Sequence, residues 1–152
     1  MRATPLFQVS DEDAGNAAGG GPTLRRPRVL IVDDEFLIRW SLREQLVAEH
    51  MEVEEAATAA EARAHFRAGA YQAVLLDLRL PDSDGLDLLR ELLGIQPTPV
   101  IVITAHGTDE TAMEAKRLGA YGFMRKPFDV EAMVELLAAA VLHGAQPNGD
   151  DR

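Results

Sequence analysis

The sequence predicts an α/β fold, in which a five-stranded parallel sheet is covered by helices on both faces. Five short apolar runs rich in Val, Ile and Leu alternate with segments whose apolar residues recur every three or four positions. Most of these runs are continuously apolar, which is typical of strands buried on both faces of a parallel sheet. Strict alternation of strand and helix requires crossover connections, and these place helices on both sides of the sheet.

The first strand is expected at 28–32, where the sequence reads Arg-Val-Leu-Ile-Val. The helix that follows is indicated by Ile38, Leu42 and Leu46, which recur four residues apart and so form one apolar face. The second strand is expected at 51–56. These elements form the first strand–helix–strand unit of the sheet.

Thr58 is a suitable N-cap for the second helix, which we expect to run to about Ala68 and to end at Gly69. A buried third strand is expected over 73–76, which reads Ala-Val-Leu-Leu. A third helix is expected over 86–93.

The fourth strand is expected over 100–103, which reads Val-Ile-Val-Ile, and the fourth helix over 111–118, just before a glycine. The fifth strand is expected over 121–125. Asp129 can cap the last helix, which we expect to end near 143.

The composition excludes several classes of protein. The formal net charge of the 152-residue chain is −10, which disfavours direct binding to nucleic acid or to an anionic membrane. There is no Cys, so disulfides and thiolate metal sites are excluded. No apolar run is long enough to span a membrane and no export signal is recognisable, so we expect a cytoplasmic protein.

Residues 1–26 contain an acidic cluster and a Gly-rich stretch, and residues 144–152 are polar. We therefore expect flexible tails on either side of one domain at 27–143. No output domain is recognisable after this span. The N-terminal Met and the polar C-terminal residues favour a stand-alone domain over one cut from a longer protein.

Polar residues follow four of the expected strands. In parallel α/β sheets, functional groups gather at the carboxyl ends of the strands. Each residue alone is typical of a turn, a helix cap or a solvated loop, and it is their combination that indicates a site. They are Asp33, Asp34 and Glu35 after the first strand, Asp77 after the third, Thr104 after the fourth and Lys126 after the fifth.

Carboxylates gathered this closely repel one another unless a cation or a proton relieves them. Oxygen ligands without His or Cys indicate a hard ion, and Mg²⁺ suits a few carboxylates with water. A carboxylate can also act as a nucleophile and form an aspartyl phosphate. Lys126 and Thr104 would then hold the phosphoryl oxygens. The residues alone therefore predict Mg²⁺-assisted phosphoryl transfer to an Asp.

Taken together, these residues resemble the receiver domain of bacterial two-component response regulators, and the details are most similar to its NtrC-like class. The resemblance covers 27–143 and implies the flavodoxin-like (βα)5 receiver architecture. The motifs that carry it are Val29 to Glu35, Leu75 to Pro81, Gly85, Thr104-Ala105, Gly119-Ala120 and Lys126-Pro127-Phe128, and those that indicate the class are Leu37 to Leu42, Thr104 to Thr108 and Gly119 to Phe123.

The resemblance implies a role for each carboxylate. Asp77 would accept the phosphoryl group from the phosphohistidine of a sensor histidine kinase or of a histidine phosphotransfer protein. The implied ligands of Mg²⁺ are Asp34, Asp77 and the backbone carbonyl of Arg79, with Asp33 acting through water.

The resemblance also implies how the phosphoryl group would be sensed. Lys126 would contact Asp77 and then the phosphoryl group, and its peptide bond to Pro127 is expected to be cis. Thr104 would bind a phosphoryl oxygen and move toward it. Phe123, three residues before Lys126, would turn inward into the space that Thr104 leaves.

Arg79 and His106 flank the expected site, and in this family their positions modulate the lifetime of the phosphoryl group. The alternative is that both are solvated loop side chains. Trp40 is expected to be exposed on the first helix. It is either an incidental surface aromatic or, by the resemblance, part of the surface that docks the kinase.

The implied function is a phosphorylation-dependent signalling switch rather than an enzyme that acts on other molecules. The added charge would change a surface formed by the helix at 111–118, the strand at 121–125 and the last helix. Small residues at Ala132 and at 138–140 would offer a face to a partner, or to a second copy in a phosphorylation-dependent homodimer. The kinase and the downstream partner are left open.

Other functions stay open beside this one. A receiver that transmits no change of shape would be a phosphate shuttle or sink in a phosphorelay. An aspartate-based Mg²⁺ phosphatase of a small molecule would show Asp-x-Asp after the first strand, whereas Asp33 and Asp34 are adjacent. A flavin-binding domain would need a Gly-rich loop where the acidic residues 33–35 would instead repel the flavin phosphate.

Overall fold

The computed structural model describes residues 26–145, so most of the tails expected at 1–26 and 144–152 lies outside the described residues. Five parallel strands form one sheet in the order β2-β1-β3-β6-β7, and the expected fold class is confirmed. A short antiparallel hairpin, β4 with β5, follows β3. The strands are Arg28–Val32 (β1), Glu52–Ala56 (β2), Ala73–Asp77 (β3), Arg79–Leu80 (β4), Ser83–Asp84 (β5), Val100–Thr104 (β6) and Gly122–Arg125 (β7).

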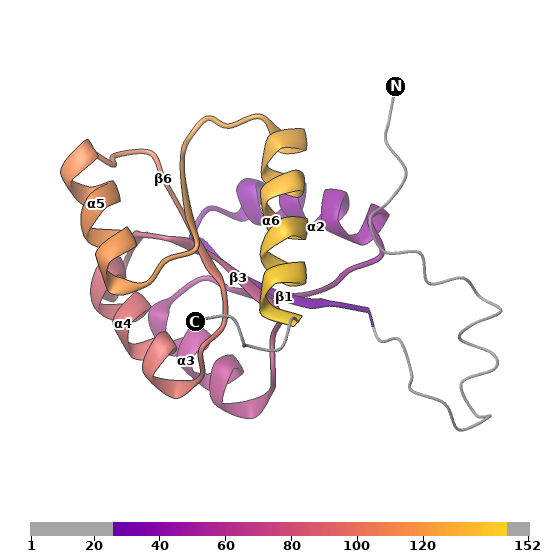
Figure 1. Ribbon diagram of the computed structural model, residues 1–152, viewed down its shortest axis with the longest axis horizontal. Helices are drawn as coiled ribbons and strands as arrows, with labels where there is room; N and C mark the ends of the chain where they lie inside the picture. Colours follow the sequence, from indigo (N-terminus) through magenta and orange to yellow (C-terminus); the bar gives the residue numbers. More distant parts are fainter. Residues whose placement is uncertain (1–25, 146–152) are drawn as a thin grey trace, which may run out of the picture.

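Helices cover both faces of the sheet (Figure 1). α2 and α6 lie side by side on one face, and α3, α4 and α5 lie in sequence on the other. No helix in the range 26–145 is long and apolar enough to cross a membrane. The helices are Phe36–Ala48 (α2), Ala59–Ala68 (α3), Gly85–Ile95 (α4), Asp109–Leu118 (α5) and Val130–Ala145 (α6).

The central strands divide the core into two layers. Side chains alternate across a strand, so Leu76 of β3 packs toward Leu88 of α4 while Leu75 packs toward Leu42 of α2. All four side chains are 0–1% exposed. Burying one such side chain contributes roughly 1.5–3 kcal/mol, so each layer fixes the sheet against its helices and makes the strand ends a rigid platform.

Side-chain caps begin the helices that cover the α3 face. Thr58 caps α3 as expected, and its hydroxyl accepts a backbone N–H of the first turn. Asp84 and Thr108 cap α4 and α5 in the same way. These two caps set the helix starts at Gly85 and Asp109. The expected starts, 86 and 111, were late because neither cap was expected from the sequence.

The last helix corrects two expectations. α6 continues to Ala145, past the expected end near 143, so the C-terminal tail does not begin at 144. Ala138 and Ala140 are 1% and 0% exposed and do not form the open face that was expected of them. Helical periodicity places them on the same side as Leu137, which packs on the sheet, and leaves Ala139 exposed.

Candidate functional site

Three polar side chains lie at the carboxyl edge of the central strands. Asp33 directly follows β1, Asp77 ends β3 and Thr104 ends β6, and all three residues are buried. The parallel register aligns these strand ends with one another. The structure therefore brings Asp33, Asp77 and Thr104 to the same edge of the sheet.

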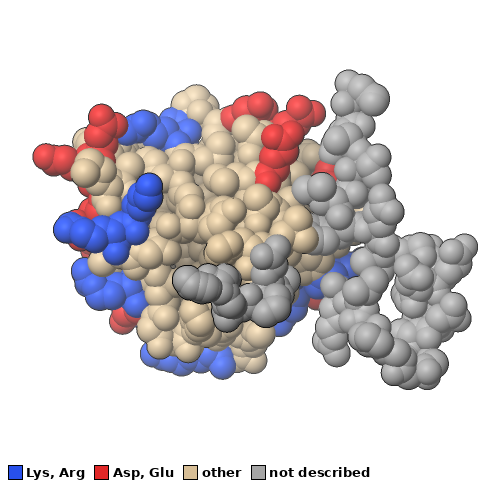
Figure 2. All heavy atoms as spheres, viewed as in Figure 1, with Lys and Arg blue, Asp and Glu red and all other residues tan. Residues whose placement is uncertain are grey.

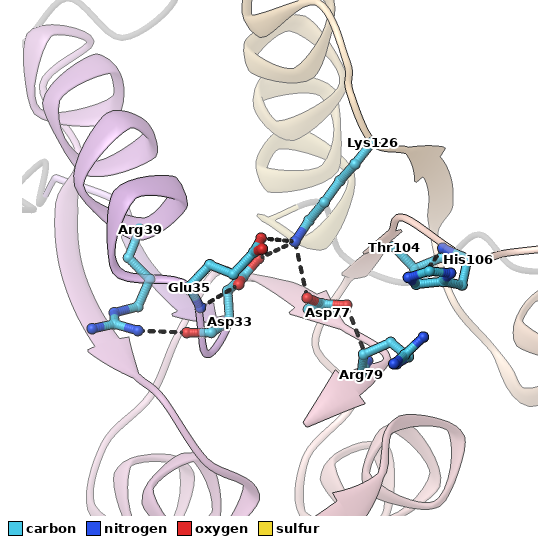
Figure 3. A network of polar contacts seen from close by, with 8 residues as sticks. All are labelled: Asp33, Glu35, Arg39, Asp77, Arg79, Thr104, His106 and Lys126. Carbon is cyan, nitrogen blue, oxygen red and sulfur yellow. Dashed lines mark hydrogen bonds and ion pairs between the residues drawn. The ribbon is translucent and has the colours of Figure 1, made fainter. Parts of the chain in front are cut away.

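Lys126 joins the carboxylates from the end of β7. Its Nζ lies 2.8 Å from Oδ2 of Asp33, 2.9 Å from Oδ2 of Asp77 and 3.0 Å from Oε1 of Glu35 (Figure 3). The Lys126 side chain is 10% exposed, and the Glu35 side chain is 60% exposed at the solvent edge. The peptide bond between Lys126 and Pro127 is cis, as expected.

The pKa values of the charged pair follow from their surroundings. Burial raises the pKa of Asp33 above its ordinary 3.8, and the charge of Asp77 adds to this, although contact with Lys126 opposes it. Burial by itself would lower the pKa of Lys126, but its contacts with the carboxylates outweigh burial and raise it. Lys126 is therefore an ammonium at neutral pH, and its charge offsets the repulsion between the buried carboxylates.

A backbone amide two residues further along the chain orients each buried carboxylate. The N–H of Glu35 donates to Oδ1 of Asp33 over 2.8 Å, and the N–H of Arg79 donates to Oδ1 of Asp77 over 3.0 Å (Figure 3). With both Oδ1 atoms held in this way, both Oδ2 atoms face Lys126.

The carboxylates of Asp33, Asp34 and Asp77 form a cluster that can hold a metal ion. Each offers one oxygen, and these oxygens lie within 4.8 Å of one another. Oδ2 of Asp33 is buried without a hydrogen-bond partner, because its contact with Lys126 is an ion pair outside hydrogen-bond geometry. Asp34 is exposed and open to water. Two buried carboxylates and one solvated carboxylate fit a hard divalent cation.

A hollow of about 340 Å³ opens over the cluster. Asp77 and Lys126 line it together with the exposed side chains of Arg79 and His106 (Figure 3). Arg79 and His106 are therefore both solvated, and both line the same hollow as the carboxylate of Asp77. The other lining residues are Asp34, Glu35, Leu80, Pro81 and Ala105.

Phe123 lies beside Thr104 with its ring packed against the core on the α3 face. A Cβ added at Gly107 would lie 2.5 Å from Cζ of Phe123 and 2.8 Å from Cγ2 of Thr104. Only a glycine therefore lets the ring pack under the β6–α5 loop in this position. Oγ1 of Thr104 accepts the N–H of His106 over 3.3 Å, which ties the same loop to the strand end.

Several residues near the site have contacts that the sequence did not reveal. Glu35 was seen as one of three clustered acids, but not as a partner of Lys126. Arg39 donates to the backbone carbonyl of Asp33, and Arg125 donates to the carbonyl of Gly107. Both arginines belong to regular elements, α2 and β7, and no sequence pattern states which way such a side chain turns.

Trp40 is exposed on α2, as expected, and is 52% accessible. Phe36 and Leu37 are 63% and 73% exposed on the first turn of the same helix. Together these three side chains form an apolar patch on α2 near the carboxyl edge of the sheet. A patch of large apolar side chains on a solvent-facing helix is typical of an interaction surface.

The fold and the site define a class: α/β proteins with an acidic cluster and a facing lysine at the carboxyl edge of a parallel sheet. The family model of the response regulator receiver domain matches residues 29–138. The chain belongs to this family.

Curated relatives agree with the family and with its NtrC-like class. The chain is 39% identical over 119 residues to the response regulator protein PilR of Pseudomonas aeruginosa, a match that covers 78% of this chain and 27% of PilR. It is 33% identical over 121 residues to the DNA-binding transcriptional regulator NtrC of Escherichia coli, covering 79% of this chain and 26% of that protein. The chain thus spans about a quarter of the length of these relatives.

Solved structures have the same fold. The receiver domain of NtrX from Brucella abortus is 38% identical, with a TM-score of 0.71, and the match covers 75% of this chain and 98% of that domain. A response regulator from Burkholderia pseudomallei with a phosphorylated aspartic acid and a calcium ion is 25% identical, with a TM-score of 0.70. That match covers 77% of this chain and 69% of the Burkholderia chain.

Proposed function

We propose that this chain accepts a phosphoryl group on Asp77 from a phosphohistidine, with Mg²⁺ at the acidic cluster, and that this event switches a signalling surface. The observation that carries the proposal is the environment of Asp77. One of its oxygens is held by the N–H of Arg79 and the other lies 2.9 Å from Lys126, beside a hollow that opens to solvent. Membership in the receiver family supports the same assignment.

In the proposed reaction, a carboxylate oxygen of Asp77 attacks phosphorus and forms an O–P bond. The N–P bond of the phosphohistidine breaks, and the imidazole leaves with the electron pair and takes up a proton. Asp33, Asp34, Asp77 and the backbone carbonyl of Arg79 would hold Mg²⁺, which neutralises charge on the phosphoryl oxygens when it is bound. The Burkholderia relative with a phosphorylated aspartic acid and a calcium ion supports this arrangement of groups.

Lys126 has two tasks in the proposal. Before transfer, its ammonium orients Asp77 and offsets the charge of Asp33. After transfer, it holds a phosphoryl oxygen as a compact point charge. Its raised pKa keeps the ammonium protonated through both stages.

Thr104 and Phe123 form the proposed switch, and Arg79 and His106 set the lifetime of the phosphoryl group. Thr104 would exchange its bond to the His106 amide for a bond to the phosphoryl oxygen. The ring of Phe123 would then turn inward into the space that Thr104 leaves. The surface that changes is the one formed by α5, β7 and α6.

The proposed partners follow from the family. The phosphodonor is a sensor histidine kinase or a histidine phosphotransfer protein, and the apolar patch of Phe36, Leu37 and Trp40 is the surface proposed to dock it. A homodimer through α5, β7 and α6 is proposed for the phosphorylated state, while the downstream partner is open. The proposal also includes a cytoplasmic location, no direct contact with nucleic acid and no enzymatic action on other molecules.

Phosphorylation of the intact chain tests the proposal. After incubation with acetyl phosphate and Mg²⁺, mass spectrometry should find a single phosphoryl adduct that Asp77→Asn abolishes and that chelation of Mg²⁺ prevents. Asp87→Asn is the matched control, because this exposed carboxylate of α4 pairs with Arg90 away from the site. An adduct that persists in Asp77→Asn contradicts the proposal.

The switch is tested separately with beryllofluoride, a mimic of the phosphoryl group. Amide resonances should shift over 104–128 and not only around Asp77. Shifts confined to the neighbourhood of Asp77 would instead support the second candidate, a phosphate shuttle or sink in a phosphorelay.

A further inference from the structure

Arg39 has no part in the reaction proposed above, yet its side chain reaches the site from α2 (Figure 3). Its Nη1 donates to the backbone carbonyl of Asp33 over 2.7 Å. Its Nε donates to Oε1 of Glu55, on the edge strand β2, over 3.0 Å. The Arg39 side chain is only 14% exposed, so both contacts are sheltered from solvent.

The carbonyl that Arg39 binds belongs to the peptide group between Asp33 and Asp34. Because a peptide group is planar, fixing its carbonyl also fixes the backbone from which both carboxylates project. On the other side of Asp33, its N–H donates to the carbonyl of Ala56 over 3.0 Å. The backbone is therefore held on both sides of the residue whose carboxylate faces Lys126.

We propose that Arg39, anchored by Glu55, is a positioning residue for the divalent-cation site. It acts through the backbone of Asp33 and does not touch the ion or the phosphoryl group. This inference rests on the proposed function, because it presumes that the acidic cluster binds Mg²⁺. A hydrogen bond from a charged group to a partner sheltered from solvent is among the stronger ones, which suits a clamp of this kind.

The charge of Arg39 and its positioning role predict opposite effects of its removal on Mg²⁺ affinity. A guanidinium near a cation site repels the bound cation, so removing the charge alone would tighten Mg²⁺ binding. Losing the clamp on the Asp33 carbonyl would weaken Mg²⁺ binding. Arg39→Lys retains the charge but lacks the planar fork that binds the carbonyl and Glu55 together, so it isolates position from charge.

Arg43 is a matched control on the same face of α2, one turn further along. Its Nη1 donates to Oε2 of Glu55 over 3.0 Å, so it shares the anchor of Arg39. Its side chain is 45% exposed. Arg43→Met removes one positive charge beside Glu55 while leaving the clamp on Asp33 in place.

The test is the Mg²⁺ affinity of the intact chain, measured by titration calorimetry. Arg39→Lys and Arg39→Met should each weaken Mg²⁺ binding about tenfold, as is usual when a group that orients a ligand is lost. Arg43→Met should change the affinity by less than about twofold, because it alters only a solvent-screened pair. Glu55→Gln should weaken Mg²⁺ binding by more than Arg43→Met does and by less than the Arg39 variants do.

A second measurement guards against a general loss of folding. Thermal unfolding in the presence of a chelator identifies variants that are still folded, and in Arg39→Lys the amide resonances of Asp33 and Asp34 should shift before Mg²⁺ is added. Unchanged or tighter Mg²⁺ binding in both Arg39 variants overturns the inference, as does an equal loss in Arg43→Met. An intact chain that does not bind Mg²⁺ overturns the proposed function as well.

Discussion

The guanidinium of Arg125 lies over the ring of Phe123, with its Cζ 5.7 Å from the ring centroid. The same side chain donates to the carbonyl of Gly107 and pairs with Asp109 at the start of α5, each over 2.9 Å. One arginine on the edge strand thus connects the ring, the β6–α5 loop and the following helix. The side chains of Arg125 and Asp109 are 51% and 96% exposed, so water screens the pair and makes it readily broken.

Replacing Arg125 should loosen the β6–α5 loop without unfolding the domain. In Arg125→Met, the amides of 106–109 should exchange with solvent faster, and stability should fall by less than about 1 kcal/mol, because the lost contacts are largely exposed. Amide hydrogen exchange followed by NMR is the measurement. Arg117→Met is the control, since Arg117 pairs with Glu114 within α5. Equal exchange rates in the two variants would show that Arg125 does not restrain the loop.

A side chain at Gly107 should displace the ring of Phe123. The added Cβ of Gly107→Ala would lie 2.5 Å from Cζ of Phe123, so we expect a destabilisation of about 1–3 kcal/mol from overpacking. Gly94→Ala is the control, because a Cβ there has no neighbour within 4 Å. In the helix α4 that substitution should stabilise the protein by about 0.5–1 kcal/mol.

The same ring position can be tested by a second substitution. The double variant Gly107→Ala with Phe123→Ala should lose less stability than the sum of the two single losses, since removing the ring of Phe123 relieves its clash with the Cβ added at residue 107. Urea unfolding of the four proteins gives the coupling. Strict additivity would mean that the ring does not occupy the space beside Gly107.

Asp33 should make the protein less stable as the pH rises. Its folded pKa is raised above the ordinary 3.8, chiefly by burial, so the carboxyl group stabilises the fold while it is protonated. This contribution is fully present below 3.8 and is lost as the pH rises through the higher folded pKa. With a chelator present, Asp33→Asn should therefore gain stability over the unmodified chain as the pH is raised to neutral. Thermal unfolding across this range checks the sign, and a gain that shrinks toward neutral pH would contradict it.

Removing the charge of Lys126 should destabilise the chain strongly. Lys126→Met leaves Asp33 and Asp77 buried without their counter-charge, and breaking such a buried pair costs about 3–5 kcal/mol. Mg²⁺ should restore part of this loss, because a cation bound only to the folded state stabilises it. Urea unfolding with and without Mg²⁺ is the measurement. Lys116→Met, on the exposed face of α5, is the control and should change stability little.

The sequence predicted the site well where strand geometry determines it. Asp33, Asp77, Thr104 and Lys126 each end or follow an apolar run, and parallel strands bring such positions to one edge. This convergence can be predicted without knowing in which direction each side chain points. The start of α4 was wrong by one residue because its cap, Asp84, lies in the short strand β5, outside the apolar periodicity of the helix.

The contacts that the sequence missed all depend on where a long side chain turns. Glu35, Arg39 and Arg125 have several rotatable bonds, and each turns toward a group on another element. Ala138 and Ala140 show the same limit for a helix, because an Ala-rich stretch does not mark which of its faces meets the sheet. Such features follow only from the packed arrangement of the elements.

The order of the strands separates two kinds of work within one small sheet. The residues that would hold the cation come from just after β1, from the end of β3 and from β4, whereas Thr104, Phe123 and Lys126 come from β6, from β7 and from just after β7. β2 lies at the opposite edge from β7, with Glu55 and Ala56 anchoring the backbone around Asp33. In the proposed function, the half that contains β1 and β3 would stay fixed while the half that contains β6 and β7 would move. Substitutions on the outer surface of α5 and β7 would therefore change which partner binds there, while the residues that line the pocket stay the same.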